Sequence, residues 1–559
     1  HPVSINTTGA LSTAGTIICG NFTCATSVTN SGINTITASG NVSITGTYSG
    51  PQAAASTVSM TGTGNLDASP QLGLLSVAGI VTIVNHPLSL AGTLTVGSSG
   101  TLSDNTENRG IAVTGTSTIN GTLNAGTGTN TFAAIGGTGI FNAGTGTVTV
   151  GGNLSVTNFN HQGGTIRLTG GLAHPARTFN NLNIDGSVQS TDAWTILGNL
   201  HILSGTWTTG ANAHSIAGNW TNSAGTAGFD GTGSTISFTG AVAHVIDGAT
   251  DFNNLTDNAW GSTLTFTAGQ SFGVSGTLTL AGGSGANLIT VQSSSLGSAW
   301  NLNNTGGNTV SFVSVADSPA LNTVNAINSI CQTPNNTNWS FGDITWLGTT
   351  SNANLGSNWS TGVTPGQYDA VTIPSGVTQP IQTGTLSLRR ITLAAALSSW
   401  SNGGQNLTFG TGGIVSSGTF IYTGAGTITN PPASFPASFE YSGTSTMHTD
   451  ITQYTHLVVS GGTITARAVT VTGNTDITGG ILSVGAISTS LGVVTIDGTL
   501  STAGTIGCAS LTCHAAGTIN NAGVNAINAS GSVTISGSFT GIATNSTITM
   551  TGATTTITA

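Results

Sequence analysis

Lysine is absent from this 559-residue chain, and charged residues of all kinds make up only 4% of it. Six arginines stand against 16 acidic residues, so the formal net charge is −10 at pH 7. Because the chain has no basic cluster, nucleic acid is excluded as an expected partner. The absence of lysine also excludes lysine–asparagine isopeptide cross-links. We therefore expect a surface of Ser, Thr, Asn and Gly, whose stability responds weakly to salt and pH.

Long apolar runs and helical patterns are also scarce. The longest apolar stretch, residues 72–84, is too short and too interrupted to span a bilayer, so we expect no membrane-spanning segment. Only residues 391–400 place apolar residues at helical spacing. The chain begins at His1, without Met or a signal sequence. Together with the composition, this leads us to expect a mature or trimmed part of an exported protein, located extracellularly or at the cell surface.

Glycine and short alternating runs are what the chain has in abundance. It contains 83 glycines, yet 37% of its residues are hydrophobic, which is enough to build a core. Apolar and polar residues alternate in runs such as 144–158 and 263–283, and Gly or Asn breaks the runs. This pattern predicts short strands joined by tight turns. Similar strand contexts recur at about one solenoid turn, roughly 20 residues, around Leu102, Leu123, Ile140, Leu154, Leu172 and Leu200.

The recurrence predicts an all-β parallel β-helix, or β-solenoid, with coils of about 20 residues. In such a stack the inward Val, Ile, Leu and Ala side chains form apolar ladders, while outward Thr, Ser and Asn form polar ladders. Glycine is expected at corners that need a positive φ or a close approach. The full chain would then form about 28 coils.

Several longer motifs point to a family of scaffolds. The sequence FNNL occurs at 179–182 and 252–255, a GNWTN turn occupies 218–222, and the segment 286–341 ends in NWSF. Residues 344–375 have the pattern that begins another unit of coils. These motifs resemble the repeats of large bacterial surface proteins with right-handed β-helix domains. The resemblance implies a right-handed solenoid in two consecutive units, 1–342 and 343–559, but that scaffold carries many functions.

The beginning of the chain is echoed near its end. Residues 11–24 (LSTAGTIICGNFTC) and 500–513 (LSTAGTIGCASLTC) agree at ten of fourteen positions. Residues 57–62 also match residues 547–552. The offset between matching residues is 489 at the first match and 490 at the last. Two interpretations stay open: a tandem repeat with a period near 490 residues, or a single protein with related coils near both ends.

Cysteines give a local signal inside this echo. Cys19 and Cys24 recur as Cys508 and Cys513, with the same C-x4-C spacing, and Cys331 is left over. In an exported protein the repeated pair predicts a disulfide that staples a coil. Free thiols stacked in a core ladder are the alternative. A metal site is not expected, because a second C-x-x-C arm is missing.

Candidate catalytic groups are few, and we expect no enzyme, no cofactor and no catalytic residue. Paired carboxylates on adjacent coils could cleave polysaccharides, but isolated Asp residues that cap turn amides are the favoured interpretation. The acids concerned are Asp230, Asp247, Asp251 and Asp257. We expect Arg389 and Arg390 to lie at a solvated strand end. We expect surface or turn roles for His161, His174 and His244.

All nine tryptophans fall between residues 194 and 400. They could stack on sugars, but in the resembled family such residues plug coil corners, and we favour plugs. An uncapped solenoid end is a template for pairing with another chain. We therefore expect a structural protein of an extracellular fibre or cell-surface filament, with tandem repeats and self-association of identical chains. The alternatives are a stalk-like adhesin that contacts glycans and, third, a polysaccharide lyase or hydrolase.

Overall fold

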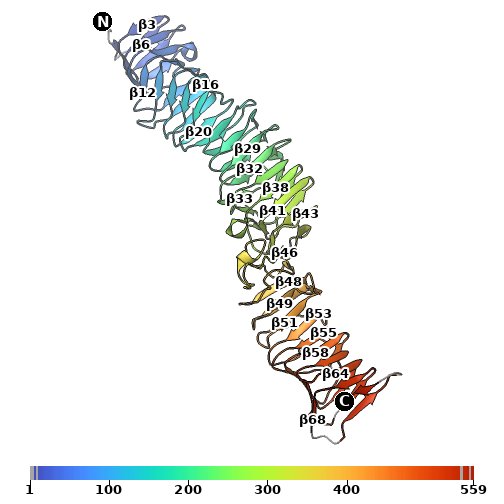
Figure 1. Cartoon of the computed structure of the whole chain (residues 1–559). Helices are drawn as coiled ribbons and strands as arrows, with labels where there is room; N and C mark the ends of the chain where they lie inside the picture. The colour runs from blue at the N-terminus through green and yellow to red at the C-terminus, as the bar shows by residue number, and fades with distance from the viewer. Residues whose placement is uncertain (1–4, 8–9, 525, 542–544, 553–555, 559) are drawn as a thin grey trace. The chain divides into compact units, whose positions relative to one another are not determined.

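The computed structural model describes residues 5–7, 10–524, 526–541, 545–552 and 556–558. They form parallel coils that follow one another about 20 residues apart, with about 27 coils in all (Figure 1). The described residues contain 70 β-strands and four short 3₁₀ helices: η1 (Ala53–Ala55), η2 (Thr226–Gly228), η3 (Gly285–Asn287) and η4 (Gly356–Asn358). The predicted all-β, right-handed β-solenoid is therefore confirmed.

The coils group into two compact units. Unit 1 comprises residues 1–281, 289–310 and 317–324, and unit 2 comprises residues 282–288, 311–316 and 325–559. The sequence motifs indicate a boundary between residues 342 and 343. That boundary separates repeating units of the sequence, whereas the two structural units are compact bodies. It stays a prediction.

Each coil at the start of unit 1 is built from three strands. The first ten strands are β1 (Ile5–Thr7), β2 (Ala10–Thr13), β3 (Thr16–Cys19), β4 (Phe22–Cys24), β5 (Ser27–Asn30), β6 (Thr35–Ala38), β7 (Val42–Ile44), β8 (Thr47–Ser49), β9 (Thr57–Met60) and β10 (Gly64–Ala68). Each strand from β1 to β7 pairs in parallel with the strand three places further along the chain. Consecutive coils therefore lie on one another in three sheets.

Inward side chains form apolar ladders, as the alternation predicts. In one sheet of unit 1, Val81 pairs with Leu102, Leu102 with Leu123, and Leu123 with Phe141. All four are fully buried. The strands concerned are β12 (Ile80–Ile83), β15 (Thr101–Ser103), β17 (Thr122–Asn124) and β19 (Ile140–Asn142). Burying such a side chain stabilises the fold by about 1.5–3 kcal/mol, so the stack gains a similar amount at every rung.

Outward polar ladders accompany the apolar ones. On the same sheet, the Asn124 amide donates to the Ser103 hydroxyl at 2.9 Å, and the Asn142 amide donates to Asn124 Oδ1 at 2.7 Å. The Asn160 amide continues the series to Asn142 Oδ1 at 2.8 Å. Identical amides one coil apart can both donate and accept, so the uncharged surface is hydrogen-bonded along the stack.

Two details go beyond what the sequence pattern indicates. Residues 391–400, the one window with helical spacing, form no helix; they run from the end of β48 (Leu386–Leu393) through a turn into β49 (Ser399–Ser401), and β48 pairs in parallel with β47 (Ala370–Ile373). Of the recurring apolar positions, Ile140 is 38% exposed and Leu172 is 67% exposed. Ile140 precedes the buried Phe141, and neighbouring residues of a strand face opposite sides of the sheet.

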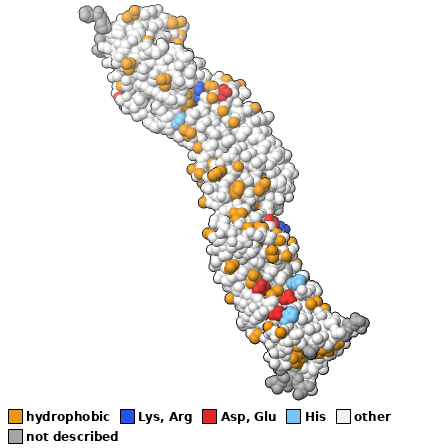
Figure 2. Space-filling view, in the orientation of Figure 1, with side chains coloured by type: hydrophobic (Ala, Val, Ile, Leu, Met, Phe, Trp, Pro, Cys, Tyr) orange, Lys and Arg blue, Asp and Glu red, His pale blue; other side chains and the backbone are white. Residues whose placement is uncertain are grey.

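The surface agrees with the composition. On the face drawn in Figure 2 most atoms belong to the backbone or to uncharged polar side chains, with scattered apolar groups and few charges. Among the residues that the structure describes, no helix has the length and apolar character needed to cross a membrane.

The last ten strands, all in unit 2, repeat the arrangement of the first ten. They are β61 (Val493–Ile496), β62 (Thr499–Thr502), β63 (Thr505–Cys508), β64 (Ser510–Cys513), β65 (Thr518–Asn521), β66 (Ala526–Ala529), β67 (Val533–Ile535), β68 (Ser538–Gly541), β69 (Thr547–Met550) and β70 (Ile557–Thr558). Here too each strand from β61 to β67 pairs in parallel with the strand three places on.

Candidate functional site

The sequence echo corresponds to equivalent coils. Strands β1–β10 of unit 1 match β61–β70 of unit 2 one for one, and each of the seven pairings in one block has its counterpart in the other. The last pairing shows how far the match extends, because Leu66 pairs with Val42 and Ile557 pairs with Val533. The two blocks therefore share strand order and pairing as well as sequence.

The cysteines occupy the same rungs in both blocks. Cys19 pairs with Ala38, and Cys508 pairs with Ala529. The second cysteine of each pair, Cys24 or Cys513, lies opposite an isoleucine of the next coil, Ile44 or Ile535 respectively. The coil environments are thus alike, as the interpretation of equivalent positions requires.

The predicted disulfides are not formed in the structure. All five cysteines are free thiols, and the four of the two repeated pairs are buried. Within each pair the two residues end separate strands on either side of a coil corner. Their sulfur atoms also have different neighbours: Cys24 Sγ lies 3.2 Å from the Ser27 carbonyl, whereas Cys19 Sγ contacts the Thr37 carbonyl at 3.7 Å. The thiols fill rungs of the core ladders, which was the alternative interpretation.

Burial also disfavours the thiolate form of three of these cysteines. It raises the pKa of Cys508 to about 11 and raises the pKa of Cys19 and Cys513 above the ordinary thiol value. A nucleophile or metal ligand must be a thiolate. Among the described residues, no group of three or more His, Cys, Asp or Glu side chains is arranged to hold a metal ion.

The candidate acids do not belong to one face. Asp247 ends β33 (Ala243–Asp247), Asp251 lies in β34 (Thr250–Phe252) and Asp257 ends β35 (Asn254–Asp257). These three strands belong to three different sheets. The fourth acid, Asp230, accepts a hydrogen bond from the Thr232 hydroxyl at 2.8 Å. The acids are therefore spread around the coil.

Asp257 illustrates what such an acid does. Its side chain is fully buried. One carboxylate oxygen accepts the Ala259 N–H at 2.8 Å, and the other accepts the Ser262 hydroxyl at 2.7 Å. These contacts hold the turn after β35, as an Asx turn does. The favoured interpretation of a turn-capping acid is confirmed here.

The histidine expectation holds for one residue and is wrong for two. His161 accepts the Gly163 N–H at 3.0 Å within a turn. His174 and His244, however, are completely buried. His244 lies at an inward position of β33 and bonds the Gly218 carbonyl at 2.8 Å, and His174 Nδ1 accepts the Leu154 N–H at 3.2 Å. Strand alternation takes the His244 ring into the core, whereas His174 lies at an isolated bridge between strands. A backbone partner satisfies each ring.

The two adjacent arginines lie in the middle of β48 rather than at a strand end. Arg390 forms an ion pair with Asp343 at 2.5 Å, and the Thr372 hydroxyl donates to the same carboxylate at 2.8 Å. Arg389 faces a different environment: its Nε donates to the Tyr368 carbonyl at 3.1 Å. The pair therefore splits into one arginine paired with an acid and one held by a carbonyl.

Eight of the nine tryptophans are buried; Trp260, at 62% exposure, is the exception. Trp194 and Trp207 stack with ring centroids 5.2 Å apart and planes 10° apart. The Trp194 indole N–H donates to the Pro175 carbonyl at 2.9 Å, and that of Trp359 donates to the Ala353 carbonyl at 2.9 Å. These eight side chains are buried as plugs would be, but five of them lie in strands rather than at coil corners. They offer no exposed stacking ladder to a glycan.

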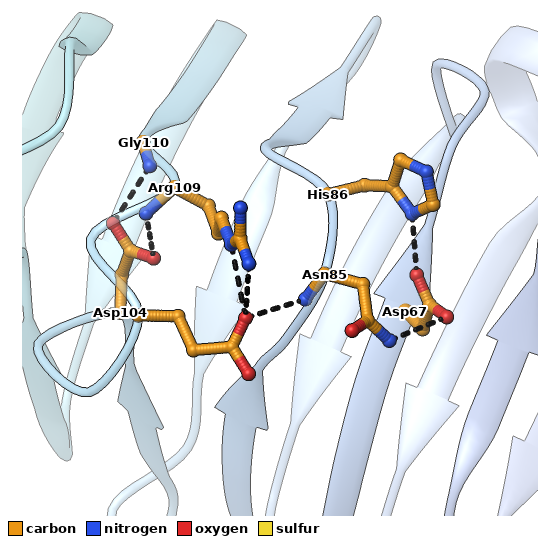
Figure 3. A network of polar contacts seen from close by, with 7 residues as sticks. Asp67, Asn85, His86, Asp104, Arg109 and Gly110 are labelled. Atoms are coloured by element: carbon orange, nitrogen blue, oxygen red, sulfur yellow. Dashed lines mark hydrogen bonds and ion pairs between the residues drawn. The ribbon is translucent and has the colours of Figure 1, made fainter.

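A charged network fastens a long loop of unit 1 (Figure 3). The carboxylate of Asp104 is buried and accepts the backbone N–H groups of Arg109 and Gly110 at 2.9 and 2.8 Å. Glu107 accepts Arg109 Nε at 2.9 Å and the Asn85 N–H at 2.8 Å. The bond from Asn85 and the contact with Arg109 hold the pKa of Glu107 below its ordinary value.

The network continues into the preceding coil. The Asn85 amide donates to Asp67 Oδ2 at 3.0 Å, and His86 Nδ1 lies 2.6 Å from Asp67 Oδ1 (Figure 3). Three successive coils thus contribute to one set of contacts. Each acid binds groups of the same chain, so the network is explained as an attachment of the loop.

No family model matches this sequence, and neither a curated protein nor a solved structure matches it.

Proposed function

We propose that this chain is a structural protein of an extracellular fibre or cell-surface filament, built from tandem β-solenoid repeats that associate end to end or laterally. The observation that carries the proposal is the equivalence of β1–β10 and β61–β70 in sequence, order and register. A catalytic site would not require ten strands to be repeated in register. A stack of tandem repeats does require it, because each repeat pairs with its neighbours through the same strands.

The register supports continuation of the stack. In unit 1 the outer edges of β9 and β10 carry β11 (Leu74–Val77) and β12. Strands β69 and β70 have the register of β9 and β10. A further copy that contributes strands like β11 and β12 would continue these ladders without a break. The role we propose is therefore mechanical, because load on such a stack is shared by many parallel hydrogen bonds.

Electron microscopy of the purified chain and of the native material tests this proposal. If each coil rises about 4.8 Å, a tandem period of about 24 coils spans about 120 Å. We expect filaments with that axial period in the native material, and association of the purified chain into longer rods. Particles that stay single at high protein concentration, together with single rods projecting from an outer membrane in native material, would contradict the proposal.

The proposal assigns no catalytic step to the chain. The separation of Asp247, Asp251 and Asp257 onto three sheets supports this part of it. The contrary result would be release of reducing ends from a polysaccharide in proportion to the amount of purified protein. The adhesin alternative needs an exposed binding surface, and the buried tryptophans do not form an exposed stacking ladder.

A further inference from the structure

A groove of about 700 Å³ opens on the surface of unit 2. Its walls come from β45 (Trp339–Phe341), from β48, from β50 (Leu407–Ser416) and from the loop before β47. The side chains that matter for its chemistry are Phe341, Tyr368, Arg389, Thr408, Phe409 and Thr411. The volume is within the range of pockets that hold small ligands.

Aromatic side chains form one wall of the groove. Trp339 and Phe341 occupy alternate positions of β45, and their rings lie 6.1 Å apart with planes only 16° apart. Trp339 is 8% exposed, whereas Phe341 and Tyr368 are partly exposed. Flat, partly exposed rings of this kind present an apolar face to a ligand.

Arg389 is the one charged side chain among the residues that line the groove. Its Nε donates to the Tyr368 carbonyl, which orients the guanidinium group, and its backbone N–H donates to the Asp369 carbonyl at 2.9 Å. Within the described residues, no carboxylate forms an ion pair with Arg389, unlike Arg390 with Asp343. Its terminal N–H groups are therefore available to an anion.

The nearest acid is already committed to the backbone. Asp369 is 2% exposed, and its two carboxylate oxygens accept the N–H groups of Cys331 and Gly366 at 2.9 and 2.8 Å. Burial raises the pKa of Asp369 to about 6. Below that pH the carboxyl group is mostly neutral and leaves the positive charge of Arg389 unopposed, whereas above it Asp369 carries a negative charge beside Arg389.

The rest of the lining is neutral and able to form hydrogen bonds. Hydroxyl and amide groups of Ser340, Gln367, Ser387, Thr408, Thr411 and Asn430 surround the aromatic wall. A purely apolar ligand would leave these groups unpaired. A polyanion such as nucleic acid would need several cations, and the groove has one.

We propose that this groove binds an acidic saccharide, a sugar whose carboxylate pairs with Arg389 and whose apolar ring face packs against Phe341 and Tyr368. Sugar hydroxyls match the neutral rim, and a carboxylate matches the two-pronged guanidinium. The inference does not depend on the fibre proposal, because the groove lies within one coil stack and would bind as well in a single chain as in a filament.

The sequence contained a signal for this groove that motif analysis misses. The groove residues Leu388 and Phe409 are register partners on neighbouring coils, and Asp369 precedes Ala370, the partner of Arg390. Residues about one coil apart therefore meet at the same place. Aligning the sequence at the coil period brings Tyr368, Arg389 and Phe409 together.

Calorimetry on the full chain tests the proposal. The probes are trigalacturonate and sialyllactose, and their uncharged counterparts are galactotriose and lactose. We expect saturable binding of at least one acidic probe and binding of its neutral counterpart that is about tenfold weaker or undetectable. Added salt should weaken the acidic complex, because an ion pair contributes to it.

Matched variants locate the binding. Arg389→Gln should weaken the acidic probe about tenfold, whereas Arg467→Gln, which removes an exposed arginine elsewhere in unit 2, should leave the affinity unchanged. Thr411→Trp places a large ring at an exposed groove position and should abolish binding. Far-UV circular dichroism and thermal unfolding check that each variant is folded.

Three results would overturn the proposal. They are absence of saturable binding for both acidic probes, equal affinity for acidic and neutral partners, and unchanged affinity in a folded Arg389→Gln variant. None of these results affects the filament test, so the two proposals fail separately.

Discussion

Acidification should destabilise unit 1 through the buried His214. This residue lies in β29 (Ala213–Ile216), is 1% exposed and packs edge-on against Trp207, with ring centroids 4.9 Å apart. Its Nδ1 accepts the backbone N–H of Trp194 at 3.1 Å. Burial lowers the pKa of His214 to about 4. The folded state therefore holds the neutral ring, and a proton on Nδ1 would face a donor.

The size of the effect follows from the two pKa values. An unfolded histidine titrates near pH 6.5, so the stabilisation by His214 is complete above about pH 6.5 and is lost as the pH falls through about 4. The difference corresponds to about 3 kcal/mol when the loss is complete and about 2 kcal/mol at pH 5. This is a large part of the usual stability of a folded domain.

The assay is urea unfolding followed by tryptophan fluorescence at pH 7 and pH 5, for the wild type and for His214→Asn. The asparagine Oδ1 can accept the Trp194 N–H in place of Nδ1 but does not titrate. We expect the wild type to lose about 2 kcal/mol more than the variant between the two pH values. Equal losses would show that His214 is not the buried neutral group described here.

Three further predictions concern other parts of the chain. Because burial raises the pKa of Asp369 to about 6, unit 2 should lose about 3 kcal/mol as the pH rises from about 4 to above 6, and Asp369→Asn should remove that dependence in the same urea assay. Gly248 and Gly163 share a φ of 84°, but only at Gly248 would a Cβ lie 1.9 Å from the Asn222 carbonyl. In thermal unfolding we therefore expect Gly163→Ala to lower the stability by about 1–2 kcal/mol and Gly248→Ala to lower it clearly more. Equal losses of stability would contradict the close packing at Gly248. Without reductant, we expect Ellman's reagent to titrate all five thiols of each chain, but only after the chain is unfolded. If two disulfides were present, Cys331 would be the one thiol that reacts.

Sequence pattern was sufficient for the architecture because every coil repeats the same physical requirements. The alternation that takes Leu102 and Leu123 inward also takes Asn124 outward, and the period sets which residues meet. The turn preference of aspartate predicted the capping role of Asp257. Sequence pattern was wrong for His174 and His244, because whether a polar residue lies in a strand or at a corner depends on strand ends that pattern locates poorly.

What the sequence alone determined is the type of coil, its length and the equivalence of the two echoed blocks, since these depend on local alternation and on repetition. Only the tertiary structure decided that Cys19 and Cys24 fill separate rungs as free thiols, because their mutual placement depends on the corner between β3 and β4. It also decided that Arg390 is paired with an acid while Arg389 lines a groove. Adjacent residues of a strand face opposite sides of the sheet, and the preceding and following coils supply the partners of each side chain.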